Sequence, residues 1–187
     1  SEELPIVNNP ENPESISRNV LFGKTLYIEK SDFLEAPPKK YFRLSPGNEV
    51  RLKGAYIIKA EEVIKNSKGE ISEIICTYDP NSKSGSGSVE SQRKVKGTLH
   101  WVSFSSNTPV EIREYDRLFE HPSPGEFSTD QIQKAINKDS INVFHGFGEK
   151  ELGNSSVGES FQFQRKGYYI KDKDSTATEP VSYTHLR

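Results

Sequence analysis

Three stretches of the chain alternate apolar residues with cationic or polar ones. They cover residues 49–60 (EVRLKGAYIIKA), 93–103 (RKVKGTLHWVS) and 109–119 (PVEIREYDRLF). A period of two is typical of a β-strand that buries one face. Arg and Lys fill most of the polar positions in the first two stretches. A sheet built from them would have one apolar face and one cationic face, which suits a polyanion.

Turn and breaker residues divide the rest of the chain into further short strands. Residues 55–78 predict a hairpin that closes at Asn66-Ser67-Lys68-Gly69, and Gly54 is expected to mark a bulge. One helix is expected over 129–137, capped by Ser128 or Thr129. The expected strands are 20–22, 25–30, 41–44, 50–53, 55–64, 70–78, 93–103, 110–117, 141–147 and 160–171.

These elements predict a mainly β chain of two β-barrels with one short helix. A length of 187 residues suits two small barrels better than one. We expect an extended lead-in over 1–19, one barrel from 20–36 plus 108–181, and a second barrel from 37–107. The Ser- and Gly-rich residues 80–92 are expected to form a flexible loop within the second barrel.

Charge is distributed unevenly along the chain. The net charge is −2, yet residues 37–59 hold six bases against one acid. Local charge decides where an anionic partner binds. The single cysteine, Cys76, excludes an internal disulfide and fits a reducing, cytoplasmic compartment, and no apolar run is long enough to span a membrane. Because the chain starts at Ser1 and contains no Met, we expect it to be part of a longer protein.

The sequence carries no catalytic or metal-binding motif. Its four histidines are far apart and lack metal-ligand spacing, and no glycine-rich phosphate loop occurs. The carboxylates are numerous, so a glycosidase pair is not excluded by counting, but nothing marks any two of them. We therefore expect no catalytic residue and no metal site.

The basic strands are a stronger signal for RNA. Arg51 and Lys53 share one strand face, and Gln162 and Gln164 share another, followed by Arg165. Arg and Gln side chains match the hydrogen-bonding edges of bases, and aromatic neighbours can stack on unpaired bases. Alternation alone also fits ordinary solvated faces of amphipathic strands.

Besides the three alternating stretches, the chain carries YFRL (41–44), Tyr78-Asp79 and FQFQRKGY (161–168). Together these segments resemble the C-terminal anticodon-binding region of the glutaminyl-tRNA synthetase family. The likeness runs in order over about residues 8–181. It implies two β-barrels, proximal and distal to a catalytic body, with the unstacked anticodon loop of tRNA-Gln (CUG or UUG) across both.

The resemblance also implies roles for individual residues. Arg43 corresponds to the arginine for the third anticodon base, while Arg51 and Lys53 fall at the first base. Gln162 and Arg165 fall at the middle base, with Gln164 beside them, and Lys39 and Lys40 are expected to meet the RNA backbone. Lys53 stands where an arginine is common, and Gln164 where a glutamate can occur.

The family's ATP-handling motifs are absent from this chain. The resemblance therefore implies that the chain alone does not activate glutamine and needs no cofactor. ATP and magnesium would serve an upstream catalytic domain of the longer protein, an aminoacyl-tRNA ligase. Residues 182–187 depart from the family pattern and are expected to form an atypical tail. A missing strand there would leave an open sheet edge.

Three other interpretations remain open from the sequence. One is the related glutamyl enzyme of the eukaryal or non-discriminating type, which shares such barrels. Another is a ribosomal 5S RNA-binding protein with one similar barrel, which the two expected barrels disfavour. The third, of a different class, is a carbohydrate-binding β-sandwich module or a glycosidase.

Overall fold

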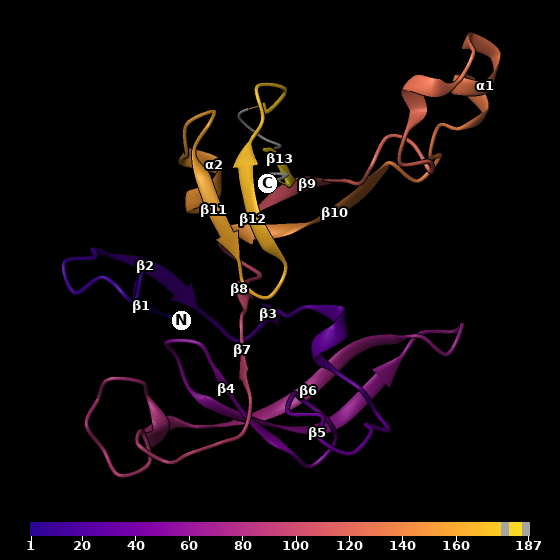
Figure 1. Ribbon diagram of the computed structural model, residues 1–187. Coiled ribbons are helices and arrows are strands. Elements are labelled where there is room, and N and C mark those ends of the chain that lie inside the picture. The colour runs from indigo at the N-terminus through magenta and orange to yellow at the C-terminus, as the bar shows by residue number, and fades with distance from the viewer. Residues whose placement is uncertain (177–179, 185–187) are drawn as a thin grey trace. The chain divides into compact units, whose positions relative to one another are not determined.

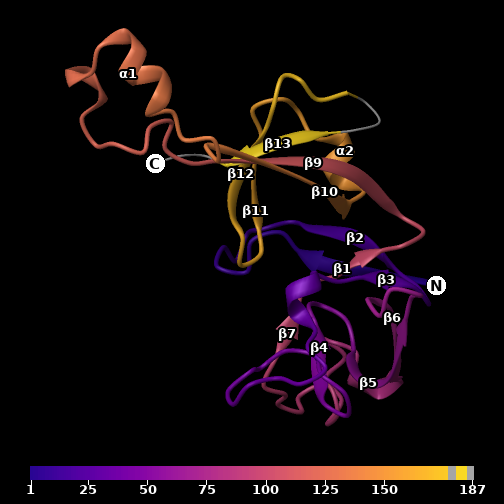
Figure 2. The same cartoon turned by 90° about the vertical axis from the view of Figure 1, so that its right-hand side faces the viewer.

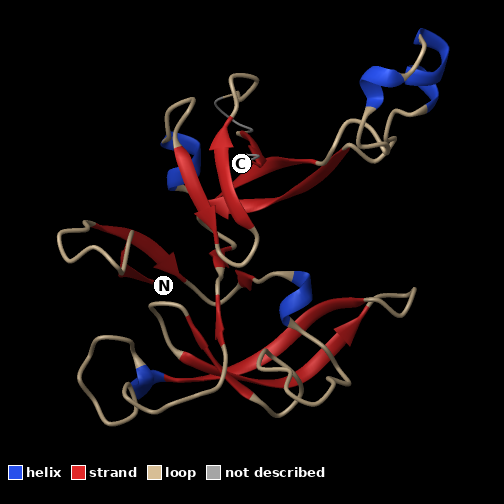
Figure 3. Cartoon of the chain, in the orientation of Figure 1, coloured by secondary structure: helices blue, strands red, loops and turns tan. Residues whose placement is uncertain are grey.

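The computed structural model describes residues 1–176 and 180–184. Its contacts divide the chain into two compact units, residues 1–106 and 107–187. Strands dominate both units (Figure 3), so the prediction of a mainly β chain is confirmed. Closure of each unit's sheets into a barrel stays a prediction.

The first unit contains eight strands among its described residues (Figure 1). A hairpin of β1 and β2 and a short pair of β3 and β8 accompany a four-stranded sheet in the order β6-β5-β4-β7. The strands are β1 Glu2–Val7, β2 Ser17–Phe22, β3 Leu26–Tyr27, β4 Glu49–Leu52, β5 Ile57–Lys65, β6 Ile71–Asp79, β7 Thr98–Leu99 and β8 Val102–Ser103. Two 3-10 turns, η1 Lys30–Asp32 and η2 Pro80–Ser82, lie between them.

One apolar core holds this unit together. Its buried members come from β1, β2, β4 and β5, and from the segments around Phe33 and Trp101. The indole of Trp101 packs edge-on against Phe22, with ring centroids 5.5 Å apart, and its Nε1–H donates to the Lys53 carbonyl at 3.0 Å. Alternate residues of β4, Val50 and Leu52, are buried, which leaves its polar face outward as the sequence predicts.

The second unit is a five-stranded sheet in the order β10-β9-β13-β12-β11. Its strands are β9 Asn107–Tyr115, β10 Ile141–Glu149, β11 Ser160–Phe163, β12 Gly167–Lys171 and β13 Val181–Thr184. Two helices, α1 Thr129–Lys134 and α2 Glu151–Asn154, and the 3-10 turn η3 Pro124–Glu126 complete it. Figures 1 and 2 both show α1 at the far end of the excursion between β9 and β10, away from the sheet.

Most predicted strands and the helix form, but several details of the prediction were wrong. Residues 93–103 form two short strands, because β7 pairs with β4 while β8 pairs with β3. Gly54 lies in the tight turn between β4 and β5 and not in a bulge. Residues 41–44 form no strand, although Leu44 makes a single bridge with Phe33. The helix α2 was missed.

The domain boundaries expected from the sequence differ from the observed grouping in three places. Part of the expected lead-in is strand β1, whose Leu4 and Ile6 are buried in the core. Residues 20–36 join that same core through Val20 and Phe33, whereas the sequence grouped them with 108–181. The expected atypical tail begins inside β13, which is a central strand between β9 and β12. Residues 185–187 lie outside the described part of the chain.

Candidate nucleic-acid interface

Arg43, predicted to read the third anticodon base, is held at one of its nitrogens. Its Nη1 lies 3.2 Å from Oδ1 of Asp32, a fully buried carboxylate, and donates to the Ser31 carbonyl at 3.2 Å. Within the described residues, Nε and Nη2 have no hydrogen-bond partner. The guanidinium is therefore fixed on one side and offers two donors on the other, the arrangement that a bidentate contact with guanine needs.

Phe42, beside Arg43, is an exposed aromatic residue that was not among the predicted site residues. Its side chain is 51% exposed, and Nζ of Lys96 lies 5.6 Å from its ring centroid. Gly97 is buried against the same residue, and a Cβ there would lie 2.4 Å from the Phe42 carbonyl oxygen. The available signal was an aromatic residue beside the arginine of YFRL.

The two lysines predicted to meet the RNA backbone are solvent-exposed. Lys39 and Lys40 occupy the turn that leads into Tyr41, and the Tyr41 N–H donates to the Pro38 carbonyl at 3.2 Å. Lys40 adopts a left-handed backbone with φ of 68°. Neither ammonium has an acidic partner within the described ranges, so both are available to phosphate.

Arg51 does not present an open fork, although the resemblance assigns it a base contact. Its two terminal nitrogens donate to three carbonyls and one hydroxyl of residues 82–93. Four of its five N–H donors are thus bonded to the chain itself. A direct bidentate contact with a base would have to break some of these bonds, and the base contact of Arg51 stays a prediction.

Lys53 lies one residue beyond β4, in the turn that leads to β5, so the predicted shared strand face of Arg51 and Lys53 is not formed. It is half-buried, and its carbonyl accepts the Trp101 indole N–H. Its ammonium has no partner in the described part of the chain. Lys53 can therefore act as the point charge that the sequence predicts for it.

In the second unit, one hairpin carries all three predicted residues. Gln162 is exposed on β11, directly opposite Tyr168 on β12, which is 56% exposed. Cross-strand partners share a sheet face, so an amide and an aromatic ring lie side by side there. Tyr168 belongs to the FQFQRKGY segment but was not among the predicted site residues.

Gln164 and Arg165 lie in the turn and not on the strand. β11 ends at Phe163, and the Lys166 N–H donates to the Phe163 carbonyl at 2.9 Å. Arg165 is exposed with a left-handed φ of 64°. Oε1 of Gln164 is buried with no hydrogen-bond donor among the described residues, so this oxygen does not face an RNA. The predicted shared face of Gln162 and Gln164 is therefore wrong.

Several other arginines are neutralised by acids. Hydrogen bonding to Glu49, reinforced by Asp79, raises the pKa of Arg93, and hydrogen bonds to Asp174 and Glu111 raise the pKa of Arg113. These guanidinium groups are committed to the protein. Among the described residues no helix is long and apolar enough to cross a membrane.

The fold and these surfaces define a mainly β protein. Its half-open arginine fork, exposed ammonium groups and aromatic rings suit an unpaired nucleic acid. Two family models, both described as the anticodon-binding domain of class I tRNA synthetases (E and Q), match residues 1–79 and 98–172. Together they cover most of the chain, and the chain belongs to this family.

The curated relatives include glutamine–tRNA ligases. The protein from Bradyrhizobium diazoefficiens is 46% identical over 184 residues, covering 97% of this chain and 32% of the relative. The protein from Clostridium perfringens is 43% identical, covering 100% of this chain and 33% of the relative. The protein from Vibrio parahaemolyticus is 46% identical, covering 96% of this chain and 32% of the relative. The chain thus spans about a third of the length of the relatives it matches.

Proposed function

We propose that the chain is the anticodon-binding region of a glutamine–tRNA ligase and recognises the anticodon of tRNA-Gln, CUG or UUG. The observation that carries this proposal is identity of 43–46% with glutamine–tRNA ligases across nearly the whole chain. The anchored, half-open guanidinium of Arg43 supports it, because guanine at the third position presents two acceptors to such a fork.

The proposed contacts divide by chemistry. Arg43 binds the third base, Lys53 approaches the first base, and Gln162 with Arg165 binds the middle base. Lys39 and Lys40 neutralise backbone phosphates, and Gln164 shapes the turn that presents Arg165. The donors of Arg51 are engaged with the chain itself. Phosphate neutralisation makes such binding strongly dependent on salt.

The longer protein would attach glutamine to its tRNA in the cytoplasm. Its catalytic domain, with ATP and magnesium, would lie outside this chain, and the present region would contribute recognition without chemistry. Rigid strands suit this role, since they hold recognition groups accurately in place.

A first test compares RNA stem-loops that differ at the third anticodon base. We expect Arg43→Ala to weaken binding to the CUG stem-loop by about 1–3 kcal/mol, and to have little effect on a CUC stem-loop. The measurement is a fluorescence titration at two salt concentrations. Lys68→Ala, in the exposed turn between β5 and β6, is the control and should leave both affinities unchanged.

Equal losses of Arg43→Ala for both RNAs would reduce Arg43 to a phosphate contact. The same pair of RNAs also tests the glutamyl alternative, because the family model covers both E and Q enzymes. Glutamate anticodons, CUC and UUC, differ from those of glutamine only in the third base. Preference of the unaltered chain for CUC would overturn the glutamine assignment. A glycan array provides the check on carbohydrate binding.

A further inference from the structure

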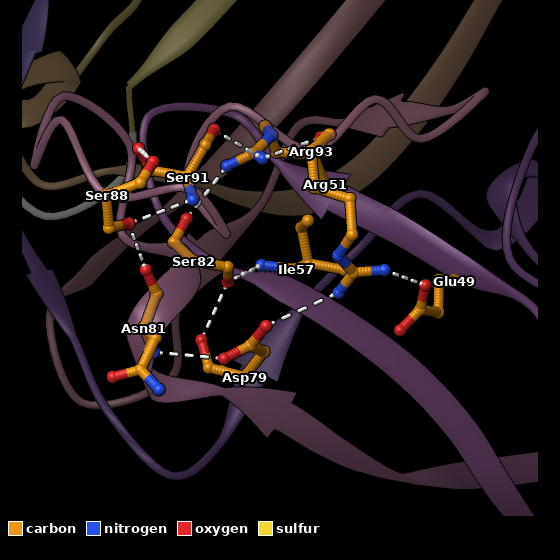
Figure 4. A network of polar contacts seen from close by, with 9 residues as sticks. All are labelled: Glu49, Arg51, Ile57, Asp79, Asn81, Ser82, Ser88, Ser91 and Arg93. Atoms are coloured by element: carbon orange, nitrogen blue, oxygen red, sulfur yellow. Dashed lines mark hydrogen bonds and ion pairs between the residues drawn. The ribbon is translucent and has the colours of Figure 1, made fainter.

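The loop of residues 80–93 is held by polar contacts (Figure 4). Val89 is the only aliphatic side chain larger than proline in residues 80–92, and it is 83% exposed. The apolar core therefore does little to hold this loop in place. Its conformation depends on hydrogen bonds that lead back to β4 and β6.

Arg51 joins the two ends of this loop through its side chain. Nη1 donates to the Ser82 carbonyl at 2.9 Å and to the Ser84 hydroxyl at 3.2 Å. Nη2 donates to the Ser91 carbonyl at 2.9 Å and to the Arg93 carbonyl at 3.2 Å. A single planar guanidinium thus fixes the start and the end of the loop together, which an ammonium with its one nitrogen would not do in the same way.

The main chain of Arg51 holds the segment that follows the loop. Its N–H donates to the Gly97 carbonyl at 2.9 Å. Arg51 therefore binds the chain on both sides of residues 94–96, at Arg93 through its side chain and at Gly97 through its backbone. Arg93 adds a second clamp, since its guanidinium pairs with Glu49 on β4 and with Asp79 at the end of β6.

The segment between these two attachments carries exposed positive charge. Lys94 and Lys96 are both exposed, and within the described residues neither pairs with an acid. The Lys96 ammonium lies over the ring of Phe42, which adjoins Arg43 in the chain. Ammonium groups beside an exposed aromatic ring are the chemistry that binds single-stranded RNA, through phosphates and a stacked base.

We propose that Lys94 and Lys96, together with the ring of Phe42, form an RNA contact, and that Arg51 is the positioning residue that sets this contact in place. This inference rests on the proposed function, because it takes the ligand to be the anticodon loop. It changes the role of Arg51: the residue acts on the RNA through the segment that it brackets and not by pairing with the first base.

The test uses the full chain, CUG stem-loop RNA and two sets of variants. Replacing both lysines, Lys94→Gln with Lys96→Gln, should lower the slope of log affinity against log salt by about 1.4, as for two lost phosphate contacts on a single strand. Phe42→Ala should lower affinity about 5- to 150-fold, as for one lost stacking contact. These side chains are exposed, so their replacement leaves the fold unchanged.

Arg51→Lys tests the positioning role, since it keeps the charge and loses the fork. We expect faster amide hydrogen exchange over residues 82–97. We also expect RNA affinity to fall about tenfold. This loss should be the same whether the first anticodon base of the stem-loop is C, U or A. Lys53→Gln, two residues further along the chain, is the control and should leave exchange in that segment unchanged.

Three results would overturn the inference. The first is an unchanged salt slope and affinity in the double lysine variant. The second is an Arg51→Lys loss confined to RNAs with the correct first base, which would make Arg51 a base contact. The third is faster exchange with unchanged affinity, which would make its role structural only. Failure of the unaltered chain to prefer CUG over CUC would instead count against the proposed function.

Discussion

At the scale of single residues, the arginines of this protein divide by what their donors bind. Arg51, Arg93 and Arg113 are occupied by carbonyls or carboxylates of the same chain, while Arg43 keeps Nε and Nη2 without a partner in the described ranges. Guanidinium groups with open donors recognise ligands, and those with satisfied donors stabilise the protein. This division separates recognition from support.

Residue types in a strand do not show which arginine belongs to which group. The resemblance directs attention to YFRL and VRLK, but the partners of Arg51 are 31 to 42 residues away in the sequence. No local pattern indicates contacts over such a separation. The open fork of Arg43 likewise depends on a buried carboxylate, Asp32, that nothing in the sequence marks as buried.

Lys171 is a buried cation with a structural role that can be measured. Its Nζ donates to the Gly153 carbonyl at 3.2 Å and to the Ser155 carbonyl at 2.8 Å, where helix α2 ends. We expect Lys171→Met to destabilise the second unit by about 1–3 kcal/mol, because two partly buried carbonyls lose their donor. Urea unfolding followed by far-UV circular dichroism measures this. The exposed Lys173→Met is the control, and equal effects of the two would contradict the assigned role.

At the scale of elements, local turn chemistry predicted hairpins well. The hairpin of β5 and β6 forms with Gly69 at φ of 79° and with Asn66 Oδ1 accepting two backbone N–H groups. The hairpin of β11 and β12 lies within the predicted strand region 160–171, but its three-residue turn was not anticipated. Turn residues act on their neighbours, so sequence indicates them directly. The switch of residues 98–103 between two sheets depends on distant strands and was missed.

Strand β1 is attached to the rest of the first unit by a carboxylate whose contribution depends on pH. Glu2 accepts a hydrogen bond from Lys83 Nζ at 2.6 Å and another from the Tyr56 hydroxyl. These bonds, that of Lys83 first, lower the pKa of Glu2 below its ordinary value. A lowered carboxyl pKa adds stability above the unfolded value, about 4.3, and that stability is lost as the pH falls through the folded pKa.

We therefore expect Glu2→Gln to be less stable than the unaltered chain at pH 7 and nearly as stable as it near pH 2. Both charged groups are partly exposed, so the difference at pH 7 is modest. Urea midpoints of the two proteins, measured by Trp101 fluorescence at a series of pH values, test this. A difference that stays constant down to the lowest pH would refute the role of Glu2. Glu3→Gln is the comparison on the same strand.

At the scale of the whole molecule, the sequence predicted the class of fold but not the division of the chain. Alternation and turns were sufficient for a mainly β chain with two units. They did not assign residues 20–36, because short apolar segments such as Val20–Phe22 can pack against more than one sheet. The observed grouping with the core of the first unit follows from contacts of Val20 and Phe33 with that core.

The single tryptophan makes the two units separately observable. Trp101 is buried in the core of the first unit, and the chain has no other tryptophan. If the units unfold independently, Lys171→Met will leave the fluorescence midpoint unchanged while it lowers the transition seen by circular dichroism. Equal shifts in both signals would show that the units unfold as one.

The place of β13 in the sheet sets an order of events during synthesis. β9 pairs in parallel with β13, and Glu111 meets Val181, a partner that is synthesised 70 residues later. The centre of this sheet cannot be completed until that strand has left the ribosome. The first unit has all its described strands by residue 103. Once β12 but not β13 has left the ribosome, the nascent chain would therefore already present Arg43 and Lys96 on a folded first unit. The hairpin that carries Gln162 would still lack β13, the strand that pairs with β12.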